Sequence, residues 1–291
     1  RQALAEAWQQ LGRVSCVLEK MLPLAAECSV IVARGADGQR GGLSESTRWL
    51  ESYQRLAERA AELPATRLVQ VGDRESDILA LMQGAQAVGW PVDILVRSRH
   101  NRRLPEGALL WDEVQASEPI GEIEFTLAAR AGRKARVVRQ QLRLKRVTLH
   151  PGEAFGAIEM TCLVASEIDA PASEKPVCWR LLTNRKAATV EEAKELIEWY
   201  RARWEIEMFF LVLKEGCRVE RLQLSDTKRL QTALALYMVI AWRINRLMRL
   251  GRTLPDLPDL PADLLFEPDE WRAAFILNKK PVPKEMPKLN T

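Results

Sequence analysis

Apolar positions after residue 44 predict an alternation of helices and strands. Residues 44–63 place apolar side chains at helical spacing, and residues 67–72 form a short apolar run typical of a buried strand. That run delivers Asp73 at its carboxyl end, where open α/β sheets place reactive groups. Helical spacing returns over residues 74–82, and residues 92–96 form another apolar strand. This order predicts an α/β segment.

The pattern changes to short β-type runs between residues 104 and 178. Residues 123–127, 136–148 and 157–165 form such runs, and loops rich in glycine and proline separate them. We therefore expect a mostly β insertion in the α/β segment.

Long helices are predicted after a further strand at residues 178–182. Thr189 and Glu192 form a capping box that starts a helix over residues 189–215. A second, largely apolar helix follows over residues 226–250, and the seven prolines of residues 251–291 predict an extended tail. The expected parts are a poorly defined segment 1–43, a partial core 44–103, a β-rich basic insertion 104–178, a core strand with helices 179–250, and a proline-rich tail 251–291.

Composition is that of an ordinary soluble globular protein. The 291 residues are 28% charged and 47% hydrophobic. Five scattered cysteines and two histidines nearly exclude a zinc site and indicate a reducing compartment, so we expect a cytoplasmic protein. The longest apolar stretch of the C-terminal half, residues 233–242, is too short to cross a membrane.

Positive charge is clustered, although the net charge is only +4. No acidic residue occurs from Thr126 to Gly152, where eight lysines and arginines lie, and four arginines lie between residues 97 and 103. Such clusters suit a polyanion, and phosphate backbones are the commonest one. The alternative is a solvated basic face without a partner.

Four polar residues of the helix over residues 189–215 share one stripe. Tyr200, Arg203, Glu207 and Lys214 lie at positions i, i+3, i+7 and i+14. An exposed Arg203–Glu207 ion pair is the simpler explanation. Because the surrounding segment is largely apolar, the stripe also fits a cleft or a DNA contact. Two carboxylates remote in sequence, Asp73 and Glu207, beside basic groups fit two-metal phosphoryl transfer.

These motifs resemble a known family. The pattern Tyr200-x2-Arg203-x3-Glu207-x6-Lys214, preceded by the segment Val71–Asp77, resembles the insertion-sequence-four group of bacterial DDE transposases. The resemblance implies an RNase H-like core interrupted by a β insertion, which transposes DNA by cut-and-paste at transposon ends. It also implies two Mg²⁺ ions as cofactors.

The resemblance also implies residue roles. Asp73 would be the second catalytic acid and Glu207 the third, and both would bind metal. Trp179 would stack on a flipped base, which suits an indole ring. The residues expected to contact DNA are Tyr200, Arg203, Lys214, Trp179, Arg97, Arg99, Arg136, Arg139, Arg143 and Lys145.

Some parts of the family pattern have no counterpart. The first catalytic Asp is not recognisable in residues 1–43, where Asp37 lies in a glycine-rich loop. An amino-terminal DNA-binding domain and carboxy-terminal dimerisation helices are also not recognised. We therefore expect a truncated transposase that is inactive alone. Intact members imply a homodimer, and the missing helices argue against one here. The alternatives are a non-catalytic DNA-binding remnant and, less favoured, an RNase H-like nuclease.

Overall fold

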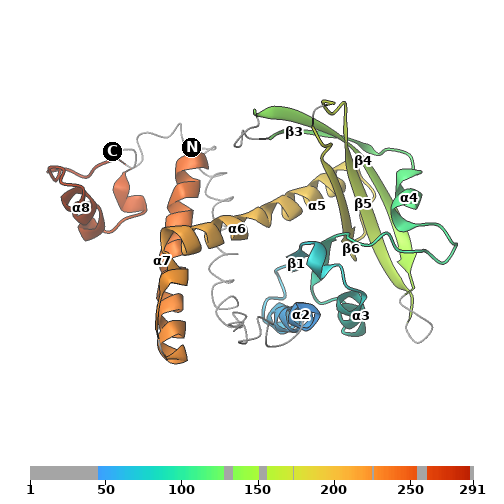
Figure 1. Cartoon of the computed structure of the whole chain (residues 1–291), viewed down its shortest axis with the longest axis horizontal. Coiled ribbons are helices and arrows are strands. Elements are labelled where there is room, and N and C mark those ends of the chain that lie inside the picture. The colour runs from blue at the N-terminus through green and yellow to red at the C-terminus, as the bar shows by residue number, and fades with distance from the viewer. Residues whose placement is uncertain are drawn as a thin grey trace. The chain divides into compact units, whose positions relative to one another are not determined.

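The computed structural model describes residues 45–127, 134–150, 156–172, 174–224, 226–253 and 261–288. It contains two compact units, one ending at Glu207 and the other continuing from Met208. The unit that ends at Glu207 is built on a six-stranded sheet (Figure 1). Its strands are β1 (Val69–Gly72), β2 (Asp93–Arg97), β3 (Gly121–Leu127), β4 (Arg136–Leu149), β5 (Ile158–Ile168) and β6 (Cys178–Thr183).

The strand order is β1-β2-β6-β5-β4-β3. Strands β1 and β2 are parallel, and every other neighbouring pair is antiparallel. The long β4–β5 pair has a continuous register from Arg139 opposite Ile168 to Leu149 opposite Ile158. The predicted β insertion therefore joins the core sheet through β6 and does not form a separate sheet.

The sheet curls strongly at its β3 end. In a flat sheet, β3 and β6 would lie about 14 Å apart, because neighbouring strands are spaced by ~4.8 Å. Yet the rings of Phe125 on β3 and Trp179 on β6 stack with centroids 5.2 Å apart and planes inclined by 14°. The curvature brings the edge strand β3 close to the start of β6, and Figure 1 shows the curled sheet.

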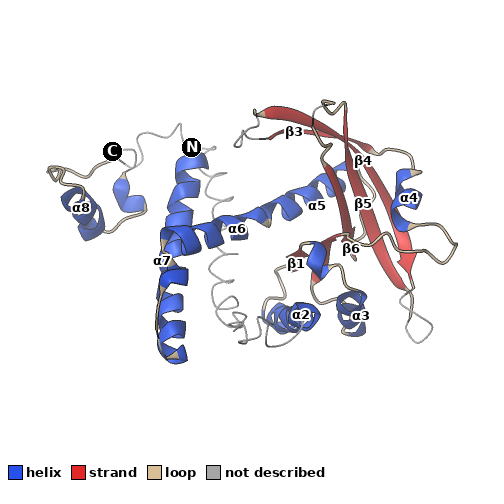
Figure 2. Ribbon diagram, viewed as in Figure 1, coloured by secondary structure: helices blue, strands red, loops and turns tan. Residues whose placement is uncertain are grey.

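Helices cover both faces of the sheet (Figure 2). One apolar cluster combines strand residues with α2 (Glu45–Glu62), α3 (Leu79–Ala87) and α4 (Leu110–Gln115). The other cluster packs α5 (Val190–Ala202) against the opposite face through Ala193, Leu196 and Ile197. Alternate residues of β2 serve the two clusters, since Leu95 faces α5 whereas Ile94 and Val96 face the other helices.

The capping box predicted at the start of α5 is confirmed. Thr189 Oγ1 accepts a hydrogen bond from the backbone N–H of Glu192 at 3.2 Å, and the Glu192 carboxylate accepts one from the backbone N–H of Thr189 at 3.1 Å. The backbone N–H groups of Ala188 and Thr189 also hold the pKa of Glu192 below its usual value. The box fixes the position from which α5 crosses the sheet.

The predicted single helix over residues 189–215 is wrong. It ends at Ala202, and α6 (Trp204–Leu211) and a π-helical turn (Val212–Gly216) follow. Two other boundaries differ. A 3₁₀ turn (Arg74–Ser76) precedes α3, where a helix over residues 74–82 was expected, and α4 lies inside the segment predicted to be mostly β.

The unit from Met208 onward is helical. It contains the 3₁₀ turns Val219–Arg221 and Ala262–Leu264 and the helices α7 (Thr227–Thr253) and α8 (Pro268–Leu277). The prediction of α7 is confirmed, whereas the prediction of an extended tail is wrong over α8. The expectations for residues 1–43 lie outside the described residues. No helix in the described part of the chain is long and apolar enough to span a membrane.

Candidate active site and nucleic-acid interface

Asp73 follows β1 and begins the 3₁₀ turn. Its Oδ1 accepts a hydrogen bond from the backbone N–H of Arg74 at 2.6 Å, and its carbonyl accepts one from Ser76 Oγ at 2.6 Å. Gly72 allows this tight turn, because a Cβ there would lie 2.0 Å from Ser76 Oγ. The parallel β1–β2 pairing therefore presents Asp73 at the carboxyl edge of the sheet, with 46% of its side chain exposed.

Arg203 brings Asp73 and Glu207 together. Its Nη2 lies 2.8 Å from Glu207 Oε1 and 3.6 Å from Asp73 Oδ2. The two carboxylate oxygens are therefore no farther apart than those two distances combined. The Arg203 side chain is 14% exposed, whereas those of Asp73 and Glu207 are 46% and 41% exposed. The guanidinium is thus enclosed, and both carboxylates remain open to solvent.

Arg203 sits at the junction of two helices, and aromatic rings flank its guanidinium. Arg203 lies between α5 and α6, and its Cζ lies 5.8 Å from the ring centroid of Tyr200 and 5.4 Å from that of Trp204. Both rings present a π face to the cation. Arg203 Nε is buried and donates no hydrogen bond to any described residue.

The donor set fits one Mg²⁺ ion. Two oxygen-donating carboxylates converge, and Mg²⁺ is commonly held by one or two carboxylates together with water and substrate phosphates. Within the described ranges there is no group of three or more His, Cys, Asp or Glu side chains that could hold a metal ion. The residues at hand therefore fit a single ion better than a complete two-ion site.

Tyr200 lies on the buried side of α5, in the core. It is 1% exposed, it belongs to the apolar cluster around Leu196, and its hydroxyl has no hydrogen-bond partner among the described residues. A phosphate contact by this hydroxyl requires the surrounding side chains to move. Its expected role in DNA binding stays a prediction.

Asp77 anchors the arginine-rich loop that follows β2, a role that the sequence did not reveal. Its carboxylate is buried and accepts hydrogen bonds from the backbone N–H groups of Arg99 at 2.6 Å and His100 at 3.0 Å. It also pairs with Arg102 at 2.7 Å. The loop of residues 97–103 is thereby held one short turn from Asp73. In the sequence, only the position of Asp77, four residues after Asp73, could have indicated this anchoring role.

The anchored loop presents basic groups beside the candidate site. Arg99 and His100 are exposed, and Arg97 is partly buried with its Nη2 3.5 Å from the Cys178 carbonyl oxygen. Arg97 and Arg99 were both expected to contact DNA. Their placement is compatible with that role.

Trp179 is engaged in a stack within the protein. Its ring stacks on Phe125, and Arg201 Cζ lies 5.1 Å from the centroid of that Phe125 ring. The indole is only partly buried at the start of β6. Stacking on a flipped base, the role expected for Trp179, would use a face other than the one on Phe125.

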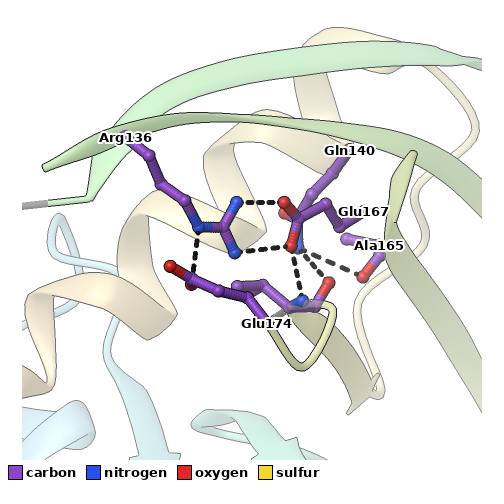
Figure 3. Close-up of polar contacts among 6 residues, drawn as sticks. Arg136, Gln140, Ala165, Glu167 and Glu174 are labelled. Carbon is purple, nitrogen blue, oxygen red and sulfur yellow. Dashed lines mark hydrogen bonds and ion pairs between the residues drawn. The ribbon is translucent and has the colours of Figure 1, made fainter. Parts of the chain in front are cut away.

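Arg136 lies in an internal ion-pair network (Figure 3). Its guanidinium makes a two-pronged contact with the buried Glu167 carboxylate, and its Nε lies 2.9 Å from Glu174 Oε2. Glu167 also accepts a hydrogen bond from the backbone N–H of Val177 at 2.7 Å. The Arg136 hydrogen bond holds the pKa of Glu167 below its usual value and raises that of Arg136. Two carboxylates balance the charge of Arg136 inside this network, and its expected contact with DNA stays a prediction.

Acidic partners also meet the other basic residues of β4. Arg139 lies 3.2 Å from Glu122 and 3.6 Å from Asp169, and Lys145 pairs with Glu113 of α4. Arg143 Nε donates to the Ser117 carbonyl at 3.0 Å. Other elements thus supply acids to a stretch that has none in its own sequence. The basic side chains of β4 are partly exposed, and they are paired within the protein.

Lys214 belongs to the other unit. It lies in the π-helical turn after α6, where its Nζ is 3.5 Å from Glu220 Oε1 and its side chain is about half exposed. Its expected contact with the phosphate near Asp73 and Glu207 stays a prediction.

Two family comparisons define the class of protein. A family model described as "Transposase DDE domain" matches residues 80–243, which is more than half of the chain. A second, described as "Transposase Tn5 dimerisation domain", matches residues 239–291. The chain belongs to the DDE-domain transposases. The predicted mixed α/β, RNase H-like fold is confirmed by this membership and by the curled sheet with its helices.

The comparisons correct one expectation. Dimerisation helices were thought to be missing, but residues 239–291, which include much of α7 and all of α8, match a transposase dimerisation domain. Their absence therefore no longer counts against a homodimer. Glu207 lies inside the range matched to the DDE domain, and Asp73 lies seven residues before it.

The Arg136–Glu167 pair predicts a pH dependence of stability. Because the folded-state pKa of Glu167 is lowered from about 4.5, its contribution is present at neutral pH and is lost as the pH falls through the folded-state value. We expect Glu167→Gln to lower the urea midpoint at pH 7 and to lose less stability than wild type between pH 5 and pH 3. Glu124→Gln, at an exposed position of β3, is the control. An unchanged midpoint at pH 7 for Glu167→Gln would contradict the prediction.

Proposed function

We propose that this chain acts in DNA cut-and-paste transposition of the insertion-sequence-four type, with Asp73 and Glu207 as metal-binding acids at the transposon end. The observation that carries the proposal is the convergence of both carboxylates, from β1 and α6, on one nitrogen of Arg203. Membership in the DDE-domain transposases supports the same reaction class.

The carboxylates would hold Mg²⁺ through oxygen ligands. A bound Mg²⁺ supplies charge stabilisation to the oxygens that attack and leave phosphorus. Asp73 is oriented for this by its own turn, since Oδ1 accepts a hydrogen bond from the Arg74 N–H and Oδ2 lies 3.6 Å from Arg203 Nη2. Arg203 lies next to both acids, where its guanidinium can bind a non-bridging phosphate oxygen. Tyr200 and Lys214 are further phosphate ligands in this proposal.

The DNA interface is proposed to include the loop of residues 97–103. Asp77 accepts hydrogen bonds from the loop backbone, which supports a role for the exposed Arg99 and the partly buried Arg97 as contacts to a phosphate of the bound DNA. Trp179 would contribute an aromatic face to a flipped base. Three basic residues of β4 are proposed as weaker phosphate contacts, namely Arg139, Arg143 and Lys145. They are weaker because each already has a partner within the protein.

A third carboxylate is needed for two-metal chemistry. The described residues bring two acids together, which supports the proposal that this chain is inactive alone. A non-catalytic DNA-binding protein of transposase descent is the second candidate, and the same observation favours it.

A homodimer is proposed through α7. Five large apolar side chains of this helix are exposed along one side at helical spacing, namely Leu236, Val239, Ile240, Ile244 and Met248. Opposite residues such as Met238 and Ala241 are buried, so α7 packs by one face and presents another. Exposed apolar stripes of this kind mark interaction surfaces. The match to a dimerisation domain from residue 239 supports a second copy of this chain as the partner.

We expect no strand nicking by this chain on a transposon-end duplex with Mg²⁺ or Mn²⁺. Two carboxylates leave one ion of a two-metal pair under-coordinated, and Mg²⁺ demands near-ideal geometry. Gel analysis of an end-labelled duplex would compare wild type with Glu207→Gln. Nicking by wild type that Glu207→Gln abolishes would contradict inactivity and would assign a third carboxylate to residues 1–43, with Asp37 as the first candidate.

Salt titration should locate the DNA interface. We expect the double variant Arg97→Gln, Arg99→Gln to reduce the slope of log affinity against log salt by about 0.9 for each phosphate that the variant no longer neutralises. The matched variant Arg139→Gln, Lys145→Gln should change the slope less, because Glu122 and Glu113 already neutralise those charges. Fluorescence anisotropy with a labelled duplex measures both. The opposite order would move the interface to β4.

Charge placed in the α7 stripe should dissociate the dimer. We expect Val239→Glu combined with Ile240→Glu to yield a monomer, because each Glu would have to be desolvated in the interface. Gln231→Glu, at an exposed position on another face of the same helix, should leave the dimer intact. Light scattering after size-exclusion chromatography measures the mass. A wild-type monomer at all concentrations, with or without DNA, would refute the proposed dimer.

A further inference from the structure

We propose that Arg203 is a built-in competitor of the catalytic metal: it neutralises Asp73 and Glu207 in the DNA-free protein and releases them when a DNA phosphate takes its guanidinium. Divalent cation and DNA would then bind cooperatively. The inference rests on the proposed function of Asp73 and Glu207 as metal ligands, and it assigns to Arg203 a regulatory role beyond phosphate contact.

The geometry makes the two cations exclusive. One nitrogen, Arg203 Nη2, lies within ion-pair distance of an oxygen from each carboxylate. A metal ion held by these two carboxylates would have to share them with the Arg203 guanidinium, and the two positive charges would repel each other at this short range. The guanidinium is positively charged at every accessible pH, so it cannot lose a proton to make room. It has to move, or the metal has to stay out.

The surroundings hold Arg203 in place without consuming its hydrogen-bonding capacity. The aromatic rings of Tyr200 and Trp204 flank the guanidinium, and its Nε–H is buried without a partner among the described residues. A buried donor without a partner raises the free energy of this arrangement. A phosphate accepts two parallel N–H···O bonds from one arginine. DNA can therefore offer an acceptor to the Nε–H group, which the two carboxylates leave without a partner.

Linkage makes the effect reciprocal. If a DNA phosphate that holds Arg203 strengthens metal binding by some factor, bound metal strengthens DNA binding by the same factor. The metal would consequently be retained mainly where a phosphate is already present. This restricts the assembly of the reactive site to protein bound at DNA.

The test measures Mn²⁺ binding to the DNA-free 291-residue chain by isothermal titration calorimetry, in a buffer without phosphate. We expect Arg203→Gln to bind Mn²⁺ about tenfold more tightly than wild type, because the competing charge is gone. Arg203→Met, which also removes the charge, should behave alike. Arg203→Lys, which keeps the charge, should stay as weak as wild type. Equal or weaker binding by folded Arg203→Gln and Arg203→Met would overturn the proposal.

A second measurement uses wild-type protein and Glu207→Gln. The DNA affinity of wild type, measured by anisotropy with and without Mn²⁺, should rise with the metal by about the factor seen for Arg203→Gln in calorimetry, and Glu207→Gln should lose this rise. No rise in wild type would overturn the cooperative role of Arg203. If Glu207→Gln leaves Mn²⁺ binding unchanged in calorimetry, the proposed metal site itself fails. If Glu207→Gln abolishes Mn²⁺ binding but the Arg203 variants match wild type, only the competition fails.

Discussion

The ion pairs of Arg203 with Asp73 and Glu207 are the interaction on which the candidate site depends. They connect the carboxyl end of β1 to the start of α6. In the sequence, the other five strands of the sheet lie between these two segments. Three structural features make this contact. Gly72 permits the tight turn that orients Asp73, the parallel β1–β2 pair sets the edge of the sheet, and the i,i+4 spacing places Arg203 beside Glu207. Because these features support one another, the site is a property of the core rather than of a loop.

The curled sheet places acidic side chains next to most of the basic residues of β4. The basic residues of β4 meet acids supplied by β3, β5, α4 and the loop before β6, so most of their positive charge is neutralised inside the unit. The buried Asp77 has the opposite effect on the loop of residues 97–103, because it fixes the backbone there and leaves the Arg99 side chain exposed. For this reason the proposed DNA interface is centred on the short arginine-rich loop rather than on the longer basic strand.

Helix α7 has a buried face and an exposed apolar face. Its buried side, which includes Ala241 and Asn245, packs within the unit, and Arg243 pairs with Glu270 of α8. This contact holds the pKa of Glu270 below its usual value, so the α7–α8 link is an ionic one at neutral pH. The exposed apolar stripe remains, within the family match to a dimerisation domain. Transposon ends come in pairs, and a twofold assembly through α7 would match that symmetry.

The sequence by itself determined the local elements and the family: the strand before Asp73, the capping box at Thr189, the strands of the β insertion and the pattern from Tyr200 to Lys214 all follow from short-range spacing. The tertiary structure decided which charges meet and which side chains stay exposed. Tyr200 shares a helical stripe with Arg203, yet it is buried because α5 presses that side against the sheet, and Arg136 is neutralised by Glu167 across the β4–β5 pair. Spacing along a chain predicts a face, but only packing and strand register determine what that face meets.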